Sequence, residues 1–368
     1  MTRVLVIGAG GVFGSRLCEG LLRHGFEVVA AGRDAGRAES VAARLRAAFP
    51  GAVVEAVALD TATLTPDLLK ATGAEIVADA AGPFQGAEPT TARAAVAAGL
   101  HYVDLADGRD FVAAFPALDG AARAAGVVAL TGCSSTPALS NAVLDRLTEG
   151  WREVASVEAA ISPGARAPRG LSVMQAILSW LGRPLRVFEA GRWTTRPGWS
   201  GFYRRDFGQA GRRRVSLCVT PDLDLFPARF EPRERALFLA GLEPWPAHLG
   251  AWVLARLVEL LRFDPVPLAG LLLRVSSWFA VAGSDRGAMR VEASGVDGEG
   301  RAVQAIWRLV AEPGEGPVTP SLPALAAIRA IAAGRVEAGA RACVGVLTLD
   351  DIVAEMAPHG LATETVAL

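Results

Sequence analysis

The sequence predicts an α/β protein in which an N-terminal doubly wound parallel sheet is joined to an α+β domain with a mainly antiparallel sheet. Over residues 1–133, short apolar runs alternate regularly with amphipathic stretches, which is the pattern of strands and covering helices. Glycines cluster directly after the first apolar run. Beyond residue 133 the loops lengthen and hairpin signals appear.

Six apolar runs within residues 1–133 are predicted to form one parallel sheet. They lie at about 3–8, 27–32, 53–59, 75–80, 101–105 and 127–132. Helices are expected between them, among others at 15–24, 90–98 and 111–125. Six strands with intervening helices complete a doubly wound unit, so we expect residues 1–133 to be one domain.

The rest of the chain is predicted to be a second domain of residues 134–345, which holds the substrate and mediates dimerisation. Its clearest signal is a hairpin of 288–295 and 301–311 around a glycine-containing turn. Further strands are expected at 154–161, 201–207 and 214–219. A helix is expected at 324–333, and the end of a strand followed by a helix at 347–359. Residues 346–368 are expected to pack back on the first domain.

The composition indicates a globular cytoplasmic protein. At 368 residues, a hydrophobic content of 51% and a mean hydropathy of +0.32 exclude disorder. A net charge of −1 gives no electrostatic footprint for nucleic acid. The four cysteines are far apart and form no C-x-x-C, so neither a metal site nor a disulfide framework is expected. The start of the chain carries no basic and apolar leader.

The most apolar region is the segment 244–283. Charged residues interrupt it before any uncharged run reaches the eighteen or so residues needed to span a bilayer. Its apolar residues form a helical stripe that includes Trp252 and Leu257. Core or homodimer packing explains the stripe; a peripheral membrane or lipid contact, or a tunnel for a greasy substrate, is the alternative.

The first strand runs into a glycine-rich turn that is typical of dinucleotide binding. Gly8, Gly10 and Gly11 allow a tight turn that brings backbone N–H groups against a pyrophosphate. Val12 and Phe13 begin the next helix, and Gly14 allows that helix to lie close to the sheet. The spacing is Gly-x-Gly-Gly-x-x-Gly, so the first domain is predicted to be of the Rossmann type.

An arginine follows the second strand where the ribose-recognition residue is expected. A carboxylate at that place would bind the ribose 2′-hydroxyl, whereas Arg33, with Arg37 nearby, can bind a 2′-phosphate. We therefore expect NADP(H) to be preferred over NAD(H). The alternative is that both arginines are solvated at a helix start.

Ligands of doubly wound sheets bind beyond the carboxyl ends of the strands, so the residues just after the later strands are the other site candidates. For the cofactor these are Asp60 at the adenine edge, and Ala81, Gly82, Pro83 and Phe84 after the fourth strand. For catalysis they are Tyr102, Asp104, Cys133 and Ser134. A helix beginning at Pro137 and capped by Thr136 or Ser135 is expected near the nicotinamide. Capping and packing roles are the alternative for each polar residue.

The scarcity of lysine narrows the chemistry. Lys70 is the only lysine, so neither Tyr102 nor Tyr203 has the lysine of a Tyr-x-x-x-Lys pair, and Schiff-base catalysis is disfavoured. Among the histidines only His101 lies in a candidate site region. Hydride transfer would therefore depend mainly on the cofactor and on positioning.

Five motifs together resemble the saccharopine dehydrogenase-like NADP-binding proteins. They are Gly8 to Gly14, Ala31 to Arg33, Ala80 to Phe84, Gly99 to Leu105 and Gly132 to Pro137. The resemblance is firm over residues 1–147 and looser beyond. It implies a Rossmann domain with an inserted α+β domain, frequent dimerisation and nicotinamide-dependent redox chemistry.

The chain departs from the lysine-biosynthetic members of this family. It lacks a Lys/His acid–base pair at recognisable positions, so their amino-acid substrate is not carried over. Arginines of the second domain either bind a substrate anion or are solvated: Arg166, Arg204, Arg205, Arg212, Arg213 and Arg214. We expect an NADP(H)-dependent oxidoreductase that reduces an imine or carbonyl of a small molecule. The alternatives are a lipid-linked trans-acting enoyl reductase and a non-catalytic NADP-binding protein.

Overall fold

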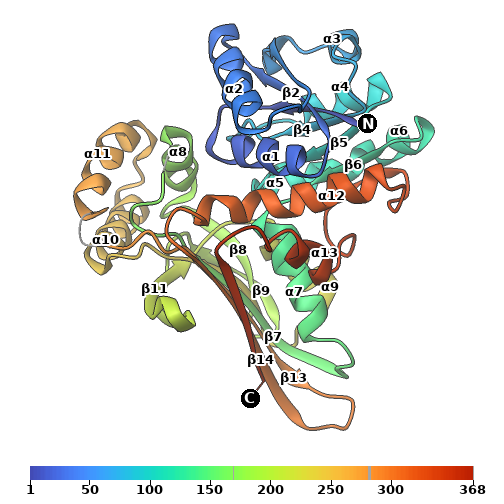
Figure 1. Cartoon of the computed structure of the whole chain (residues 1–368). Helices are drawn as coiled ribbons and strands as arrows, with labels where there is room; N and C mark the ends of the chain where they lie inside the picture. Colours follow the sequence, from blue (N-terminus) through green and yellow to red (C-terminus); the bar gives the residue numbers. More distant parts are fainter. Residues whose placement is uncertain (169, 281–282, 368) are drawn as a thin grey trace. The chain divides into compact units, whose positions relative to one another are not determined.

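The chain forms two compact units, each built around its own sheet (Figure 1). The structure, a computed structural model, describes residues 1–168, 170–280 and 283–367. The first unit comprises Met1–Leu139 and Pro317–Glu355, and the second comprises Ser140–Gly316 and Met356–Leu368.

The sheet of the first unit is parallel and confirms the predicted doubly wound class. Six strands lie close to the predicted positions: β1 (Arg3–Ile7), β2 (Glu27–Gly32), β3 (Val54–Ala58), β4 (Ile76–Asp79), β5 (His101–Asp104) and β6 (Val128–Thr131). A seventh strand, β15 (Gly339–Ala342), pairs parallel with β6 and was not predicted. The strand order is β15-β6-β5-β4-β1-β2-β3.

Helices of the first unit lie between these strands. They are α1 (Val12–Arg23), α2 (Ala35–Ala48), α3 (Pro66–Ala71), α4 (Thr90–Ala98), α5 (Arg109–Ala114), α6 (Asp119–Ala124), α12 (Leu322–Ala332) and α13 (Leu349–Ala354). The single helix predicted over 111–125 is wrong. Pro116 has no N–H to donate, and a short 3₁₀ turn, Phe115–Leu118, separates α5 from α6.

The chain returns to the first unit at Pro317, earlier than the predicted position 346. Figure 1 shows α12, in orange, running beside α1, and α12 also contacts β5. The packing is close, because a Cβ added to Gly20 of α1 would lie 2.7 Å from Leu325 of α12. The last residues belong to the second unit instead, where β16 (Leu361–Ala367) pairs with β14 (Ala302–Ala311).

The sheet of the second unit is mixed and mostly antiparallel, as predicted. Its path is β10-β11-β12-β7-β13-β14-β16, with β8 paired to β12 and β9 to β8. Besides β14 and β16, the strands are β7 (Glu153–Ser162), β8 (Pro184–Glu189), β9 (Arg192–Pro197), β10 (Tyr203–Asp206), β11 (Arg212–Leu217), β12 (Arg235–Ala240) and β13 (Ala288–Val296). The predicted hairpin is β13–β14, and β12 with β7 is a parallel pair.

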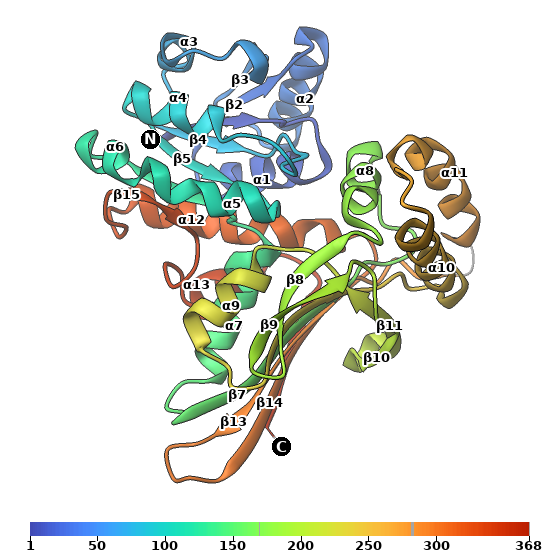
Figure 2. The same ribbon diagram turned by 180° about the vertical axis from the view of Figure 1, so that it is seen from behind.

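Two helices cover this sheet and three others lie apart from the long strands. In Figure 2, α7 (Ser140–Leu147) and α9 (Asp222–Phe230) lie next to the long strands, and they contact β13 and β12 respectively. The others are α8 (Leu171–Trp180), α10 (Trp245–Leu261) and α11 (Ala269–Ala280).

The apolar segment predicted at 244–283 forms α10 and α11, apart from residues 281–282, which lie outside the described residues. In the part of the chain that the structure describes, no helix is long and apolar enough to cross a membrane.

Candidate functional site

The glycine turn after β1 is closed by backbone contacts that leave no room for a side chain at Gly8 or Gly14. Gly8 has φ +78°, and a Cβ there would lie 3.0 Å from the backbone of Ala80 and Ala81. A Cβ on Gly14 would lie 2.2 Å from the Gly8 carbonyl oxygen. Gly10 has no such restriction, since its Cβ would make an ordinary 3.5 Å contact with Val41. The close approaches therefore require glycine at positions 8 and 14.

The start of α1 offers unpaired donors beside this turn. Its N-cap is Gly11, which has no side chain to cap the helix, and the first turn carries no acidic residue. The first N–H groups of a helix have no partner within it, so those of Val12 and Phe13 face an anion-binding position reinforced by the helix dipole. Gly10, Gly11 and Val12 are exposed. This turn fits the pyrophosphate of a dinucleotide.

Arg33 lies just beyond the end of β2, which is hydrogen-bonded to the glycine turn. The N–H groups of Gly8 and Ala9 both donate to the Ala31 carbonyl, at 3.1 and 3.3 Å. Arg33 and Arg37 are exposed, and no hydrogen bond or ion pair of either guanidinium occurs within the described residues. A guanidinium with free donors at this place fits a 2′-phosphate.

Asp60, predicted at the adenine edge, caps the short 3₁₀ turn Thr61–Thr63. Its carboxylate accepts a hydrogen bond from the Ala62 N–H at 3.0 Å, and its side chain is exposed. The capping role is thus observed, while contact with adenine stays a prediction.

The loop after β4 presents its backbone and buries one aromatic ring. Ala81, Gly82 and Pro83 are exposed, whereas Phe84 is buried and packs edge to face on Phe111, with ring centroids 5.2 Å apart. Asp79, at the end of β4, fixes the start of this loop: its carboxylate accepts a hydrogen bond from the Ala81 N–H at 2.9 Å. This arrangement matches the predicted passage of a cofactor along the backbone of the loop.

Three of the four residues predicted to be catalytic are completely buried. Tyr102, Asp104 and Cys133 each have 0% exposed surface, and Ser134 has 6%. Asp104 Oδ1 accepts hydrogen bonds from the Ala106 N–H, the Thr131 hydroxyl and the Gly132 N–H, at 2.9, 2.9 and 2.7 Å. The other carboxyl oxygen of Asp104 and the Tyr102 hydroxyl are buried without a hydrogen-bond partner.

Burial dominates the ionisation of this cluster. It raises the pKa of Asp104 to about 7, against the lowering effect of the three donors. Burial, and then the carboxyls of Asp104 and Asp79, raise the pKa of Tyr102 well above its usual value. Burial and then the Cys343 thiol raise the pKa of Cys133 strongly. Neither Tyr102 nor Cys133 is therefore an activated nucleophile in this structure.

The helix predicted to begin at Pro137, after a cap at Thr136 or Ser135, agrees with the structure. Thr136 has extended backbone, with φ −135° and ψ 127°, as an N-cap residue does, and Pro137 to Leu139 are helical and lead directly into α7. Ser134 lies in the turn before it, and its N–H donates to the Gly132 carbonyl at 2.8 Å. The expected helix N-terminus therefore follows Thr136, and its place beside the nicotinamide stays a prediction.

Three of the six arginines that were considered as substrate ligands in the second unit are engaged in structural contacts. Arg205 donates two hydrogen bonds to the buried Glu158, at 2.6 and 2.7 Å. Arg213 is buried and donates to the Ser162 and Arg286 carbonyls. Arg214 lies over the Phe202 ring. These three guanidiniums stabilise the sheet.

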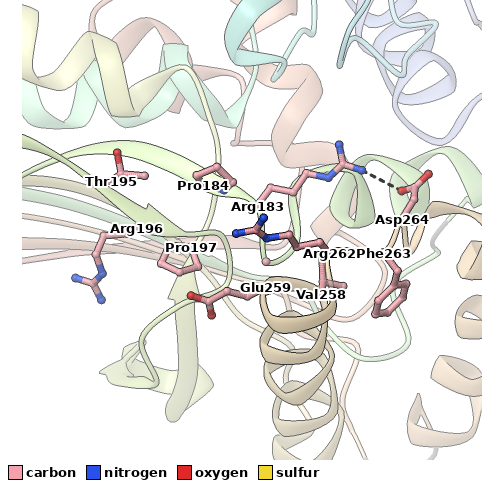
Figure 3. A pocket seen from close by; sticks show the side chains of 11 residues that line it. Arg183, Pro184, Thr195, Arg196, Pro197, Val258, Glu259, Arg262, Phe263 and Asp264 are labelled. Carbon is pink, nitrogen blue, oxygen red and sulfur yellow. Dashed lines mark hydrogen bonds and ion pairs between the residues drawn. The ribbon is translucent and has the colours of Figure 1, made fainter.

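The second unit has an open pocket of about 660 Å³ between β8, β9 and the end of α10 (Figure 3). Two of its arginines are in ion pairs: Arg183 with Asp264 at 3.0 Å and Arg196 with Glu189 at 2.8 Å. None of the predicted site residues lines it. Across the described residues, no group of His, Cys, Asp and Glu could hold a metal ion, and the four cysteines have free thiols.

Asp79 is the residue of this region that the sequence analysis missed. It aligns with Asp104 across the β4–β5 pair. The signal was available, since both aspartates end their strands.

Comparison with known proteins agrees with this geometry. Residues 4–145 match the family model described as saccharopine dehydrogenase NADP binding domain. A solved structure of saccharopine dehydrogenase (L-Glu forming) from Saccharomyces cerevisiae is similar over 100% of both chains, with a TM-score of 0.70 and 12% sequence identity.

Two other solved structures are similar over short stretches. A sorbitol-6-phosphate 2-dehydrogenase from Erwinia amylovora is 15% identical over 35% of this chain and 69% of that one, with a TM-score of 0.30. A short-chain dehydrogenase from Sphingobium yanoikuyae in complex with NADPH is 23% identical over 28% and 53%, with a TM-score of 0.23. No curated protein matches the chain.

The fold and the glycine turn define a Rossmann-type dinucleotide-binding protein, and the family model identifies the dinucleotide as NADP(H). Residues 4–145 are an NADP-binding domain of the saccharopine dehydrogenase type, and the whole chain shares the fold of saccharopine dehydrogenase.

Proposed function

We propose that the protein is an NADP(H)-dependent oxidoreductase that reduces an imine or a carbonyl of a small molecule. The observation that carries the proposal is the backbone anion site of Gly8 to Gly14, linked to β2 beside an unpaired Arg33. NADPH, when bound, supplies the hydride. The backbone N–H groups of Val12 and Phe13 would hold its pyrophosphate, and Arg33 and Arg37 its 2′-phosphate.

The four residues that were predicted to be catalytic have different roles in this proposal. Tyr102, Asp104 and Cys133 have no exposed surface and would act by shaping the loops. Ser134 has a small exposed fraction and follows β6, so it is the one of the four best placed to touch a substrate. Small-molecule substrate and cofactor would then meet at the carboxyl ends of β4 to β6.

Cofactor titration and turnover test this proposal separately. NADPH fluorescence should change on addition of the protein, and Arg33→Ala should weaken that binding. NADPH oxidation is then followed with a panel of 2-oxo acids and ketones, with and without primary amines. Turnover that requires the amine indicates imine reduction; turnover without it indicates carbonyl reduction. Unchanged NADPH fluorescence would refute the proposal. Binding without turnover across the panel would favour the non-catalytic alternative.

A second candidate is an oxidoreductase that acts on a lipid-linked substrate at a membrane surface. The specific observation is an exposed stripe on α10 in which apolar residues recur every fourth position: Trp245, Leu249, Val253, Leu257 and Leu261. Leu260 beside it is 76% exposed. His248, Ala255 and Val258 are the buried residues on the opposite face of α10, so packing of this helix on its own unit does not explain the exposed apolar stripe. The exposed Arg262 ends the helix and could bind an anionic headgroup.

Co-sedimentation with vesicles of anionic phospholipid tests the lipid alternative. Binding that is lost in Leu257→Glu and Leu261→Glu would support it. Leu68→Glu, at an exposed leucine of α3, is the matched control and should leave binding intact. The stripe could instead be covered by a second copy of the chain, in the proposed homodimer. Light scattering of the same variants measures the molar mass and so tests this alternative. Vesicles left unbound by the wild type would remove the lipid alternative.

A further inference from the structure

Two aspartates end neighbouring strands of the first sheet at the same level and in the same local geometry. Asp79 of β4 and Asp104 of β5 are register partners. Each accepts a hydrogen bond from the backbone N–H two residues later, Ala81 and Ala106, at 2.9 Å in both cases. Each carboxyl therefore fixes the direction in which the chain leaves its strand.

Asp104 also reaches the next loop. Its Oδ1 accepts from the Gly132 N–H at 2.7 Å and from the Thr131 hydroxyl, and its backbone carbonyl accepts from the Cys133 N–H at 2.8 Å. A single buried residue thus joins the loop after β5 to the loop after β6. Loss of its carboxyl would leave three donors without an acceptor in a buried position.

The loops that these aspartates hold are packed backbone to backbone. A Cβ on Gly108, after β5, would lie 2.8 Å from the Phe84 carbonyl oxygen in the loop after β4. A Cβ on Gly132, which has φ +73°, would lie 2.5 Å from the Pro137 ring of its own loop and 3.5 Å from the Ala106 carbonyl oxygen in the loop after β5. Such contacts have little room to adjust, so a shift in one loop is transmitted to the next.

The protonation of Asp104 explains why a carboxyl group can be buried at the end of β5. All three donors meet Oδ1, while Oδ2 is buried without a partner. Since burial raises the pKa of Asp104 to about 7, a proton on Oδ2 near neutrality avoids a buried charge. An asparagine has the same shape as that neutral acid and keeps the accepting oxygen.

We propose that Asp79 and Asp104 are positioning residues that fix the loops after β4, β5 and β6 as one platform for the nicotinamide end of the cofactor. This inference rests on the proposed function, because the nicotinamide end of a dinucleotide lies beyond the carboxyl ends of these strands. Asp79 is 5% exposed and Asp104 is 0% exposed. The aspartates therefore act through the backbone of the loops and do not touch the cofactor themselves.

Hydrogen exchange of the cofactor-free protein, followed by NADPH titration, tests this role. Asp104→Ala should accelerate exchange in residues 105–108 and 132–137 and weaken NADPH binding roughly tenfold, with Asp79→Ala acting on residues 80–84. Asp104→Asn should restore both, because it keeps the acceptor. Asp297→Ala is the matched control: Asp297 accepts from the Glu299 N–H at 2.9 Å in the β13–β14 turn of the second unit.

The outcomes separate this inference from the proposed function. Wild-type protein that fails to bind NADPH overturns the proposed function. Normal wild-type binding, with exchange and affinity unchanged in Asp104→Ala, overturns the positioning role. Faster exchange with unchanged NADPH affinity overturns the link between the platform and the cofactor. If Asp104→Ala does not fold, Thr131→Val removes one of the three donors and should give smaller effects in the same direction.

Discussion

Gly14 in the first turn of α1 lies so close to Gly8 that a Cβ on Gly14 would stand 2.2 Å from the Gly8 carbonyl oxygen. The contact is between backbones, so no side-chain rotation can relieve it. It holds the start of α1 against the end of β1, where the unpaired N–H groups of the helix face the expected pyrophosphate. Packing and anion binding therefore depend on the same pair of glycines.

Gly14→Ala should destabilise the protein and impair NADPH binding together. Relief of the overlap requires α1 to move from β1, at a cost of about 2 kcal/mol in the free energy of unfolding. Urea denaturation measures that cost. Gly10→Ala is the stability control, because its Cβ makes an ordinary contact at 3.5 Å. Equal stability of the wild type and Gly14→Ala would contradict the structure.

Arg33→Ala should weaken binding of NADP(H) by roughly ten- to a hundredfold and leave NAD(H) binding nearly unchanged. A charge-assisted hydrogen bond to a phosphate contributes about 1.5–3 kcal/mol to binding. NAD(H) has no 2′-phosphate, so its complex has no such hydrogen bond to lose. Titration with both cofactors at fixed ionic strength gives the ratio. Arg192→Ala, at an exposed arginine of the second unit, is the control for general loss of positive charge. Parallel weakening of both cofactors would count against the 2′-phosphate role.

Asp104→Asn should flatten the pH dependence of stability between about pH 4 and 7. The pKa of Asp104 in the folded protein is about 7, above its ordinary value of 3.8, so its contribution is fully present below pH 3.8 and is lost as pH rises through 7. The upper limit of the loss is about 4 kcal/mol. Asp79, Tyr102 and Cys133 are the neighbouring titratable groups, and burial also raises the pKa of Asp79.

The measurement is the free energy of unfolding of the wild type minus that of Asp104→Asn across this pH range. Subtraction removes the background titration of the remaining groups. A difference that does not fall with rising pH would show that Asp104 is already ionised in the folded protein at low pH.

Glu355→Ala should destabilise the first unit by about 3 kcal/mol. Glu355 is 2% exposed, accepts from His24 Nε2 at 2.8 Å and pairs with Arg329. The substitution removes the shared acceptor of His24 and Arg329, so the loss is that of two hydrogen bonds to a charged group. Thermal or urea unfolding checks the loss, with Glu337→Ala, at an exposed glutamate before β15, as the control. Equal effects of the two substitutions would show that the α1 to α12 connection contributes little.

The long apolar strands of the first sheet were predictable because strands buried on both faces are continuous apolar runs, as in Val4 to Ile7. β15 was missed because Gly339–Ala342 contains glycine, alanine and arginine only, and the strand exists through its pairing with β6. β16 was missed for a related reason: its threonines and glutamate are mostly exposed, and its position is set by β14.

The cofactor half of the site was more predictable than the catalytic half. A glycine turn is specified locally, by conformations and approaches that side chains forbid, so Gly8 and Gly14 could be recognised from the chain alone. The depth of a side chain depends on the whole fold. Asp104 could therefore be placed at a strand end, but its three donors and its burial could not be foreseen. The structural roles of Arg205 and Arg213 could not be predicted either, because their hydrogen-bond partners are distant in sequence.

The last strand of the NADP-binding sheet has a consequence for how the protein is made. β15 comes from residues 339–342, so a ribosome that has finished β6 must still synthesise about two hundred residues before the edge of that sheet is covered. During this interval β6 is a bare parallel edge with its backbone groups unpaired. The nascent NADP-binding region is thus exposed to wrong strand pairing until the end of translation, and fragments cut after β6 inherit that open edge permanently.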